Sequence, residues 1–180
     1  FRRVLFRSSK IVKYFLNYGN PEKPEVFYDF TEGVKGIADA CNALSFIDDE
    51  PIPIVSGNVS FYNESKQGSA VVPSPVIVAV GKMEDYHKAL TMQVKKPGMN
   101  IILIGQRFAE YGGTQVNNIY QGLNNVAPQV RLDFEAKNNK VVHALINQRL
   151  LAACHDISMG GFWVSILEML LGERGLFQTG

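Results

Sequence analysis

The fold of this chain is decided by residues 11–27, IVKYFLNYGNPEKPEVF, where a strand-like run, a turn and the start of a helix follow one another. Residues 11–18 are rich in β-branched and aromatic side chains, which favour a strand, and the tripeptide GNP at 19–21 favours a turn. From residue 25 to residue 44 apolar side chains recur every three or four positions, as in a helix of about five turns with one buried stripe. This order predicts packed layers of strands and helices, an α/β or α+β fold.

Two glycines interrupt the predicted helix. Gly33 and Gly36 each cost about 1 kcal/mol relative to alanine inside a helix. We therefore expect that the helix packs closely against a sheet at both positions.

Four further apolar runs predict strands. Residues 52–55 form a short one that leads into a turn beginning at Ser56. Residues 76–80 and 100–105 are almost wholly apolar, which is typical of strands covered on both faces. Residues 152–154 predict one more buried strand.

Three helices are predicted in the second half of the chain. A short one lies between residues 113 and 122, and a longer one follows Asp133, which can act as its N-cap. The last begins at Gly160-Gly161 and is apolar on two sides, so we expect it to be deeply packed.

Two stretches suggest how the chain is divided. Residues 72–75, VPSP, predict a boundary because prolines are disfavoured in a central strand, so 9–72 and 73–180 are expected to be separate domains. Residues 1–8, FRRVLFRS, lack the apolar core of a signal peptide and are expected to be a non-native leader. Since the chain ends at LFQTG without a helix cap, we expect an internal piece of a larger protein with a truncated last domain.

Composition limits the classes of function. With 46% hydrophobic and 19% charged residues over 180 positions, the chain can build a core. Its 18 basic and 17 acidic residues give no basic field for nucleic acid or lipid, and no apolar run approaches the roughly 20 residues of a membrane span. Cys41 and Cys154 form no C-x-x-C pair, which argues against a disulfide scaffold or zinc ribbon and for the cytoplasm.

Residues 56–65, SGNVSFYNES, are the first candidate site. Gly57 lacks a Cβ, so a phosphate can approach the backbone N–H groups, and the Asn58 side-chain oxygen suits Mg²⁺. Ser60 can donate a hydrogen bond to a substrate oxygen. The alternative is a hairpin turn in which serine and asparagine bond their own backbone.

Residues 155–161, HDISMGG, are the second candidate site, between a predicted strand and a predicted helix. The free N–H groups of a glycine-rich helix start attract anions. The histidine is either an acid–base group or a structural residue, and Asp156 or Ser158 can instead cap the helix. A second glycine pair opens the short helix near residue 113. The residues that could line a common cleft are His155, Asp156, Gly160, Gly161, Gly112 and Gly113.

Several well-known catalytic patterns do not occur in the sequence. His143 is followed four residues later by Asn147, so a zincin-like histidine pair is not formed. No G-x-S-x-G or G-x-G-x-x-G motif is present, and we assign no catalytic residue.

Six blocks of the sequence, in order from about residue 11 to 171, resemble the synthetase subunits of the phosphoribosylformylglycinamidine synthases, within the aminoimidazole-ribonucleotide-synthetase-like superfamily. HD-x-S-x-GG is shared across the superfamily, whereas GNP-E-x-PEV-F and GNVSFYNE are more specific to this family. The blocks are LNYGNPEKPEVF (16–27), VKGIADAC (34–41), VSGNVSFYNES (55–65), VPSPVIVAVG (72–81), LDFEAK (132–137) and CHDISMGG (154–161).

The resemblance implies the end of an ATP-binding-type α/β domain followed by a smaller C-terminal α/β domain. It implies a ligase of purine biosynthesis that uses ATP, Mg²⁺ and ammonia from a glutaminase partner to convert formylglycinamide ribonucleotide into formylglycinamidine ribonucleotide, ADP and phosphate. By position it makes Gly57 an ATP contact, Asn58 a magnesium ligand and Ser60 a substrate contact.

Two positions depart from the family pattern. Tyr14 stands where the family has an ATP-contacting Asp, and Met159 stands where it has an Asp between Ser and GG. The family's catalytic histidine belongs to another domain, so this chain alone is expected to be inactive. Two alternatives remain: a non-catalytic scaffold half that docks a glutaminase, and a cousin such as aminoimidazole ribonucleotide synthetase.

Overall fold

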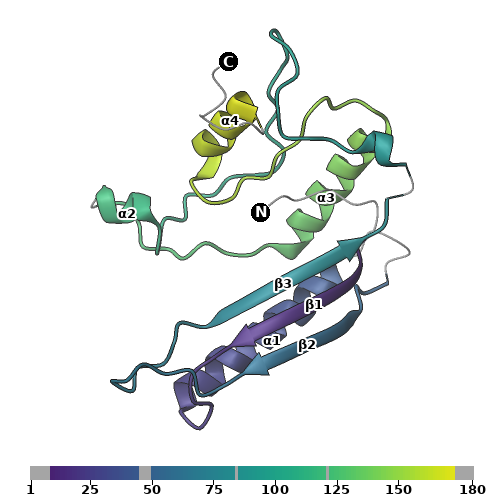
Figure 1. The fold of residues 1–180 in the computed structure, drawn as a ribbon. Coiled ribbons are helices and arrows are strands. Elements are labelled where there is room, and N and C mark those ends of the chain that lie inside the picture. Colours follow the sequence, from purple (N-terminus) through teal and green to yellow (C-terminus); the bar gives the residue numbers. More distant parts are fainter. Residues whose placement is uncertain (1–8, 45–49, 84, 121, 173–180) are drawn as a thin grey trace.

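The described part of the chain is a mixed α/β structure with a small sheet and several helices (Figure 1). The computed structural model describes residues 9–44, 50–83, 85–120 and 122–172, so the expected leader at 1–8 lies outside it. None of its described helices is long and apolar enough to cross a membrane. Its elements are β1 (Ser9–Asn17), α1 (Pro24–Ala43), β2 (Ile54–Ser60), β3 (Ser74–Gly81), the 3-10 helix Tyr86–Lys88, α2 (Gln115–Ile119), α3 (Leu132–Asn147) and α4 (Gly161–Leu171).

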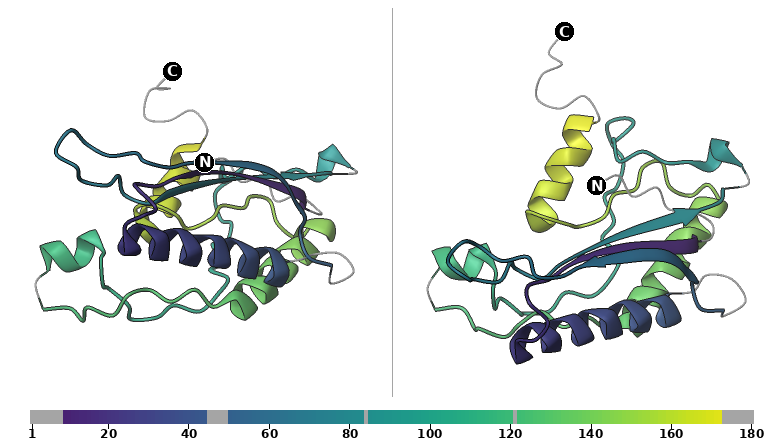
Figure 2. Two further views of the ribbon diagram at one scale, coloured as in Figure 1. Left: turned by 90° about the horizontal axis from the view of Figure 1, so that it is seen from below. Right: turned by 60° about the horizontal axis from the view of Figure 1, so that its bottom comes forward.

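The sheet has the strand order β2-β1-β3, with β1 parallel to β2 and antiparallel to β3. Helix α1 connects β1 to β2 and lies along one face of the sheet, behind it in Figure 1 and beneath it in the left view of Figure 2. The strand and helix predicted from residues 11–44 are therefore confirmed. We call the opposite face the open face; register and alternation place on it Ile11, Lys13, Phe15, Asn17, Ser56, Asn58, Ser60, Val76, Val78 and Val80.

The core lies between β1 and α1. Leu16, Tyr18 and Val26 are buried, with 5% or less of their surface exposed. Partly buried side chains surround them, and Phe30 packs edge-on against Tyr18 at 5.4 Å between ring centroids. The surrounding side chains are Tyr14, Phe30, Ile37 and Phe61.

The two helix glycines differ in their surroundings. A Cβ built at Gly33 would overlap the Tyr18 hydroxyl, so close packing does require glycine there. No atom lies within 4 Å of a Cβ built at Gly36, so the same expectation is wrong for Gly36.

Two predicted strands are not strands in the described structure. Residues 100–105 and 152–154 have no regular secondary structure. A strand needs a second backbone to pair with, and sequence reasoning cannot supply one. Around residues 152–154 the structure shows one such contact, from the Cys154 N–H to the Thr91 carbonyl at 3.1 Å.

Strand β3 confirms the strand predicted at 76–80 but not its burial. Val76, Val78 and Val80 are 41–51% exposed, because they lie on the open face of β3, which is one of the two outer strands of this sheet. The outer position also explains how Pro75 is accommodated opposite Leu16. Since β3 pairs with β1, this sheet contains a strand from beyond residue 72; the division into 9–72 and 73–180 stays a prediction.

Two details of the later helices differ from expectation. Helix α3 begins at Leu132 with Arg131 at the N-cap, which puts Asp133 in the first turn instead of at the cap. Helix α4 begins after Gly160 as expected but is not deeply packed, since Trp163 is 74% exposed and Leu170 is 59% exposed. Helix α2 confirms the short helix expected between residues 113 and 122.

Candidate functional site

Gly57, Asn58 and Ser60 lie within β2. The turn expected from residue 56 onward is therefore wrong, because pairing with β1 carries the strand as far as Ser60. Successive side chains of a strand point to opposite faces. Gly57 consequently faces the α1 layer, whereas Asn58 and Ser60 face the open side.

Gly57 is packed under an aromatic ring. Its Cα partner across the strands is Tyr14, whose side chain belongs to the rim of the core. A Cβ built at Gly57 would lie 2.6 Å from both Cδ2 and Cζ of that ring, so no side chain fits at this position. The space that a ligand would occupy in front of Gly57 on the α1 side is filled by Tyr14.

The backbone groups of Gly57 point elsewhere. The Ser60 carbonyl accepts a hydrogen bond from the Tyr18 N–H at 3.0 Å, so Ser60 presents its backbone to β1. Successive residues of a strand present their backbone N–H and C=O groups to opposite edges, and Gly57 lies three positions before Ser60, so its backbone groups point toward the outer edge of the sheet. A phosphate could reach this N–H only from that edge.

Asn58 is exposed and lies beside Phe15 on the open face. Lys13 occupies the same face, with its Nζ 4.9 Å from the centroid of the Phe15 ring. The amide and the ammonium group thus flank one aromatic ring. Sequence reasoning missed Lys13, although a lysine at an alternate position of an otherwise apolar strand could have indicated it.

Ser60 is held by the turn that follows β2. The Asn63 side-chain amide donates to the Ser60 hydroxyl at 3.0 Å and to the carbonyls of Ser60 and Tyr18 at 2.9 and 3.0 Å. Farther along, Lys23 binds Glu64 at 2.6 Å and holds the pKa of that carboxyl below its ordinary value. Serine and asparagine therefore do bond the backbone here, as the hairpin alternative proposed, but beyond Gly57 and Asn58.

The residues of this region fit magnesium better than they fit a nucleotide. Asn58 offers an amide oxygen on an accessible face, and Mg²⁺ accepts oxygen ligands while keeping several waters. No cluster of three or more His, Cys, Asp or Glu that could hold a metal occurs among the residues the structure describes. Asn58 could thus be one ligand of a magnesium ion that phosphate, water or another part of a larger protein completes. Because Tyr14 fills the space before it, Gly57 does not fit a nucleotide on the α1 side.

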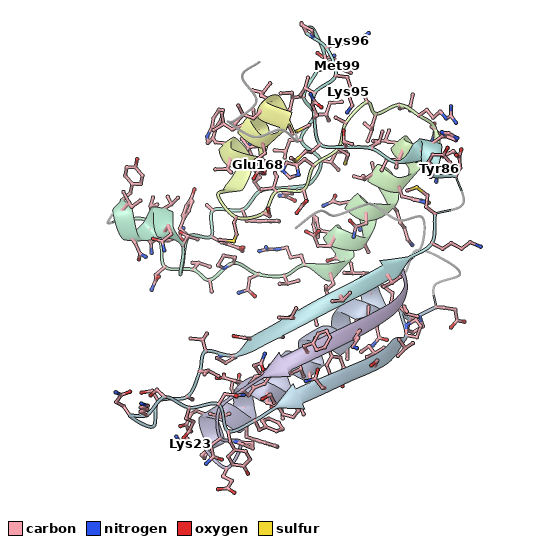
Figure 3. All side chains as sticks on the ribbon, viewed as in Figure 1. Lys23, Tyr86, Lys95, Lys96, Met99 and Glu168 are labelled. Atoms are coloured by element: carbon pink, nitrogen blue, oxygen red, sulfur yellow. The ribbon has the colours of Figure 1, made fainter. Side chains whose placement is uncertain are left out.

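His155, in the second candidate site, is fixed by carboxylates. Its Nε2 lies 2.7 Å from Oε2 of Glu168 on α4, and its Nδ1 lies 3.7 Å from Oδ1 of Asp156 (Figure 3, where Glu168 is labelled). Only 11% of its side chain is exposed. These contacts hold the imidazole in place and are compatible with both alternatives for His155, and Glu168 is a partner that sequence reasoning missed.

The glycines near the second site have local structural reasons. Gly160 is the N-cap of α4 with φ +86°, a left-handed conformation that favours glycine, and neither Asp156 nor Ser158 caps the helix with its side chain. Gly161 and Gly113 also have positive φ. Gly112 is buried, and its N–H donates to the Val126 carbonyl at 2.7 Å.

The two candidate sites lie apart. Figure 1 places α4 and β2 at opposite ends of the view, with β3 and β1 between them. The cleft expected from His155, Asp156, Gly160, Gly161, Gly112 and Gly113 stays a prediction.

Comparisons with known proteins identify relatives of both halves. Residues 96–176 match the family model described as "AIR synthase related protein, C-terminal domain". The chain is also 45% identical over 165 residues to the "Phosphoribosylformylglycinamidine synthase subunit PurL" of Methanothrix thermoacetophila. That alignment covers 89% of this chain and 21% of the relative, so the chain spans about a fifth of the relative's length. The resemblance inferred from the motifs is confirmed.

Proposed function

We propose that this chain is part of the synthetase subunit of a phosphoribosylformylglycinamidine synthase, a ligase of purine biosynthesis. The observation that carries the proposal is the 45% identity to a subunit of that name over 89% of the chain. The match to the AIR-synthase-related C-terminal domain supports it independently over residues 96–176.

The reaction would convert formylglycinamide ribonucleotide into formylglycinamidine ribonucleotide. ATP would supply the phosphoryl group that turns the formamide oxygen into a leaving group, and ammonia from a glutaminase partner would replace it. Within this chain, the Asn58 amide oxygen would hold and orient a magnesium ion on the open face. Ser60, positioned by Asn63, would donate a hydrogen bond to a substrate oxygen.

The rest of the machinery would lie in the remaining four-fifths of such a subunit. We assign no general acid, general base or nucleophile to this chain, so the chain alone should not turn over. A cytoplasmic location and a glutaminase partner belong to the same proposal.

The test uses the complete enzyme that carries this chain. Asn58→Ala should raise the Mg²⁺ concentration needed for half-maximal product formation and should lower the rate at least tenfold, because an oxygen ligand is lost. The matched control is Asn42→Ala, an exposed asparagine on α1, which should leave both quantities unchanged. An unchanged Mg²⁺ requirement for Asn58→Ala would instead favour the scaffold role. A complete enzyme that forms no formylglycinamidine ribonucleotide would overturn the proposed function.

A further inference from the structure

We propose that Asn17 is a further substrate-binding residue, which together with Ser60 and Ser74 binds the amide-bearing part of the ribonucleotide substrate. The inference rests on the proposed function, because it deepens the site in which Ser60 is expected to contact that substrate. Its basis is a set of polar side chains across one end of the sheet, which we call the polar row. The polar row consists of Ser60, Asn17 and Ser74.

The register of the sheet sets the side chains of the polar row next to one another. Asn17, on the central strand β1, is paired with Ser60 on one side and with Ser74 on the other. Directly paired residues of neighbouring strands project to the same face, so the polar row lies on the open face. Neighbouring strands are about 5 Å apart, so one small ligand group can reach two of these side chains at once.

The polar row lies where α/β sheets bind their ligands. Strands β1 and β2 are parallel, and Figure 1 shows their arrowheads at the end of the sheet where β3 begins. In open α/β sheets, ligands bind outside the carboxyl ends of the strands. Farther along β3 the open face carries Val76, Val78 and Val80, so Ser74 places a polar group on this strand at the ligand-binding end.

Hydrogen bonds already made by the polar row define what it offers to a ligand. The Asn63 amide donates to the Ser60 hydroxyl at 3.0 Å, whose own proton makes only a long contact of 3.4 Å and can turn to a ligand. The Ser74 hydroxyl donates to the Val72 carbonyl at 2.7 Å, so its oxygen is left as an acceptor. Within the described part of the chain the Asn17 side chain makes no hydrogen bond, so its amide can both donate and accept.

This pattern suits a neutral amide better than a phosphate. The side chains of the polar row carry no charge, whereas phosphate sites use cationic side chains or several backbone N–H groups. A substrate amide presents one acceptor and one donor close together, and the Asn17 side chain offers the complementary pair. The proposed substrate, formylglycinamide ribonucleotide, carries such groups. Asn17 therefore selects for the amide-bearing arm of this substrate.

Steady-state kinetics of the complete enzyme that carries this chain test the polar row. Asn17→Ala should raise the KM for formylglycinamide ribonucleotide about tenfold and leave the KM for ATP unchanged, because contacts to the ribonucleotide alone are lost. Ser74→Ala should raise the same KM by only about threefold, because it removes a single acceptor. The matched control is Asn42→Ala on helix α1, which should leave both KM values as in the wild type. An unchanged KM for the ribonucleotide in Asn17→Ala, or an equal rise in the KM for ATP, would overturn the proposal.

A second variant keeps the test decisive if Asn17→Ala does not fold. Asn17→Asp keeps the size of the side chain and an acceptor oxygen but removes the N–H donor. Because the side chain is exposed, this variant should keep the thermal midpoint of the enzyme, and it should raise the KM for the ribonucleotide as Asn17→Ala does. A wild-type KM for Asn17→Asp would show that Asn17 does not bind the substrate amide, whatever happens to the midpoint.

These measurements separate the inference from the proposed function. A wild-type enzyme that forms no formylglycinamidine ribonucleotide overturns the function. Unchanged KM values of the variants in an enzyme that does form it overturn the role of the polar row and leave the function standing.

Discussion

Two regions of the molecule use apolar sequence in different ways. The described residues from 9 to 81 form a sheet with one covering helix and contain most of the buried apolar side chains of the described structure: Val12, Leu16, Tyr18, Val26 and Cys41. The described residues from 82 to 172 form the 3-10 helix and three α-helices, joined by irregular segments, and Ile146 is the buried apolar side chain among them. Apolar runs of the sequence form strands in the first region because the backbone of β1 is there to pair with them. Similar apolar runs in the second region have no regular secondary structure.

In the second region, polar contacts contribute more to holding the segments together. Arg131 forms an ion pair with Glu110, and its guanidinium lies 3.6 Å from the centroid of the Phe108 ring. His155 joins the segment before α4 to Glu168. The strength of such contacts depends on their geometry and on the protonation of the groups. The stability of the first region depends mainly on the apolar area that folding removes from water.

The largest effect should come from breaking the core of the first region. Leu16→Ala should lower the free energy of unfolding by about 2–5 kcal/mol, because the side chain is 98% buried and its removal leaves a cavity. Guanidinium denaturation measures the change. The control is Ile102→Ala in the second region, which is 70% exposed and should change stability by no more than about 0.5 kcal/mol. Equal losses for the two variants would contradict the contrast between the regions.

Two glycine substitutions test how closely helix α1 packs in the first region. Gly36→Ala should raise the free energy of unfolding by about 0.5–1 kcal/mol, because alanine favours the helix and the new methyl group meets nothing. Gly33→Ala should instead lower it by about 1–3 kcal/mol, because the methyl group overlaps the Tyr18 hydroxyl. Thermal melts of the two variants side by side measure the difference. If both stabilise the chain, Tyr18 and α1 are not closely packed.

What could be predicted from the sequence follows the same division. Strand β1 and helix α1 have a clear local periodicity, so residues 11–44 were enough to predict both. The run at 100–105 has an equally clear strand pattern, but pairing with a distant backbone decides the outcome, and no local pattern encodes that.

The residues of the candidate site stay a prediction, and their structural setting could not be predicted from the sequence. Asn58 was proposed as a magnesium ligand because its side-chain oxygen suits Mg²⁺. The strand that carries it, and the ring of Tyr14 behind Gly57, depend on the register between β1 and β2. The contact between His155 and Glu168 likewise arises only when α4 folds back on the preceding segment.

Acid should weaken the second region through Glu110. Hydrogen bonds from Arg131 and from the Gln129 N–H hold the pKa of this carboxyl at about 2, well below its ordinary 4.5. Because the folded-state pKa is depressed, the stabilisation is fully present above about pH 4.5 and is lost as the pH falls toward 2. Hydrogen exchange of residues 108–131 between pH 5 and 2.5 should therefore show the segment opening at low pH.

Glu110→Gln tests that assignment. This variant should open the segment already at pH 5 and should make exchange free energies there depend less on pH. Glu32→Gln, an exposed carboxylate on α1, is the control and should leave the profile of this segment as in the wild type. A wild-type profile for Glu110→Gln would show that the ion pair with Arg131 does not hold the segment.

The smallest expected effect concerns Trp163, the single tryptophan of the chain. Its side chain is 74% exposed on α4, so Trp163→Ala should change the free energy of unfolding by no more than about 0.5 kcal/mol. In the wild-type chain the tryptophan emission should already resemble that of the unfolded chain and should be quenched readily by acrylamide. A blue-shifted emission that moves to the red on unfolding would contradict this, because it would mean that the outer face of α4 is covered. Repeating the measurement over a range of protein concentrations would then show whether a second copy of the chain provides the cover.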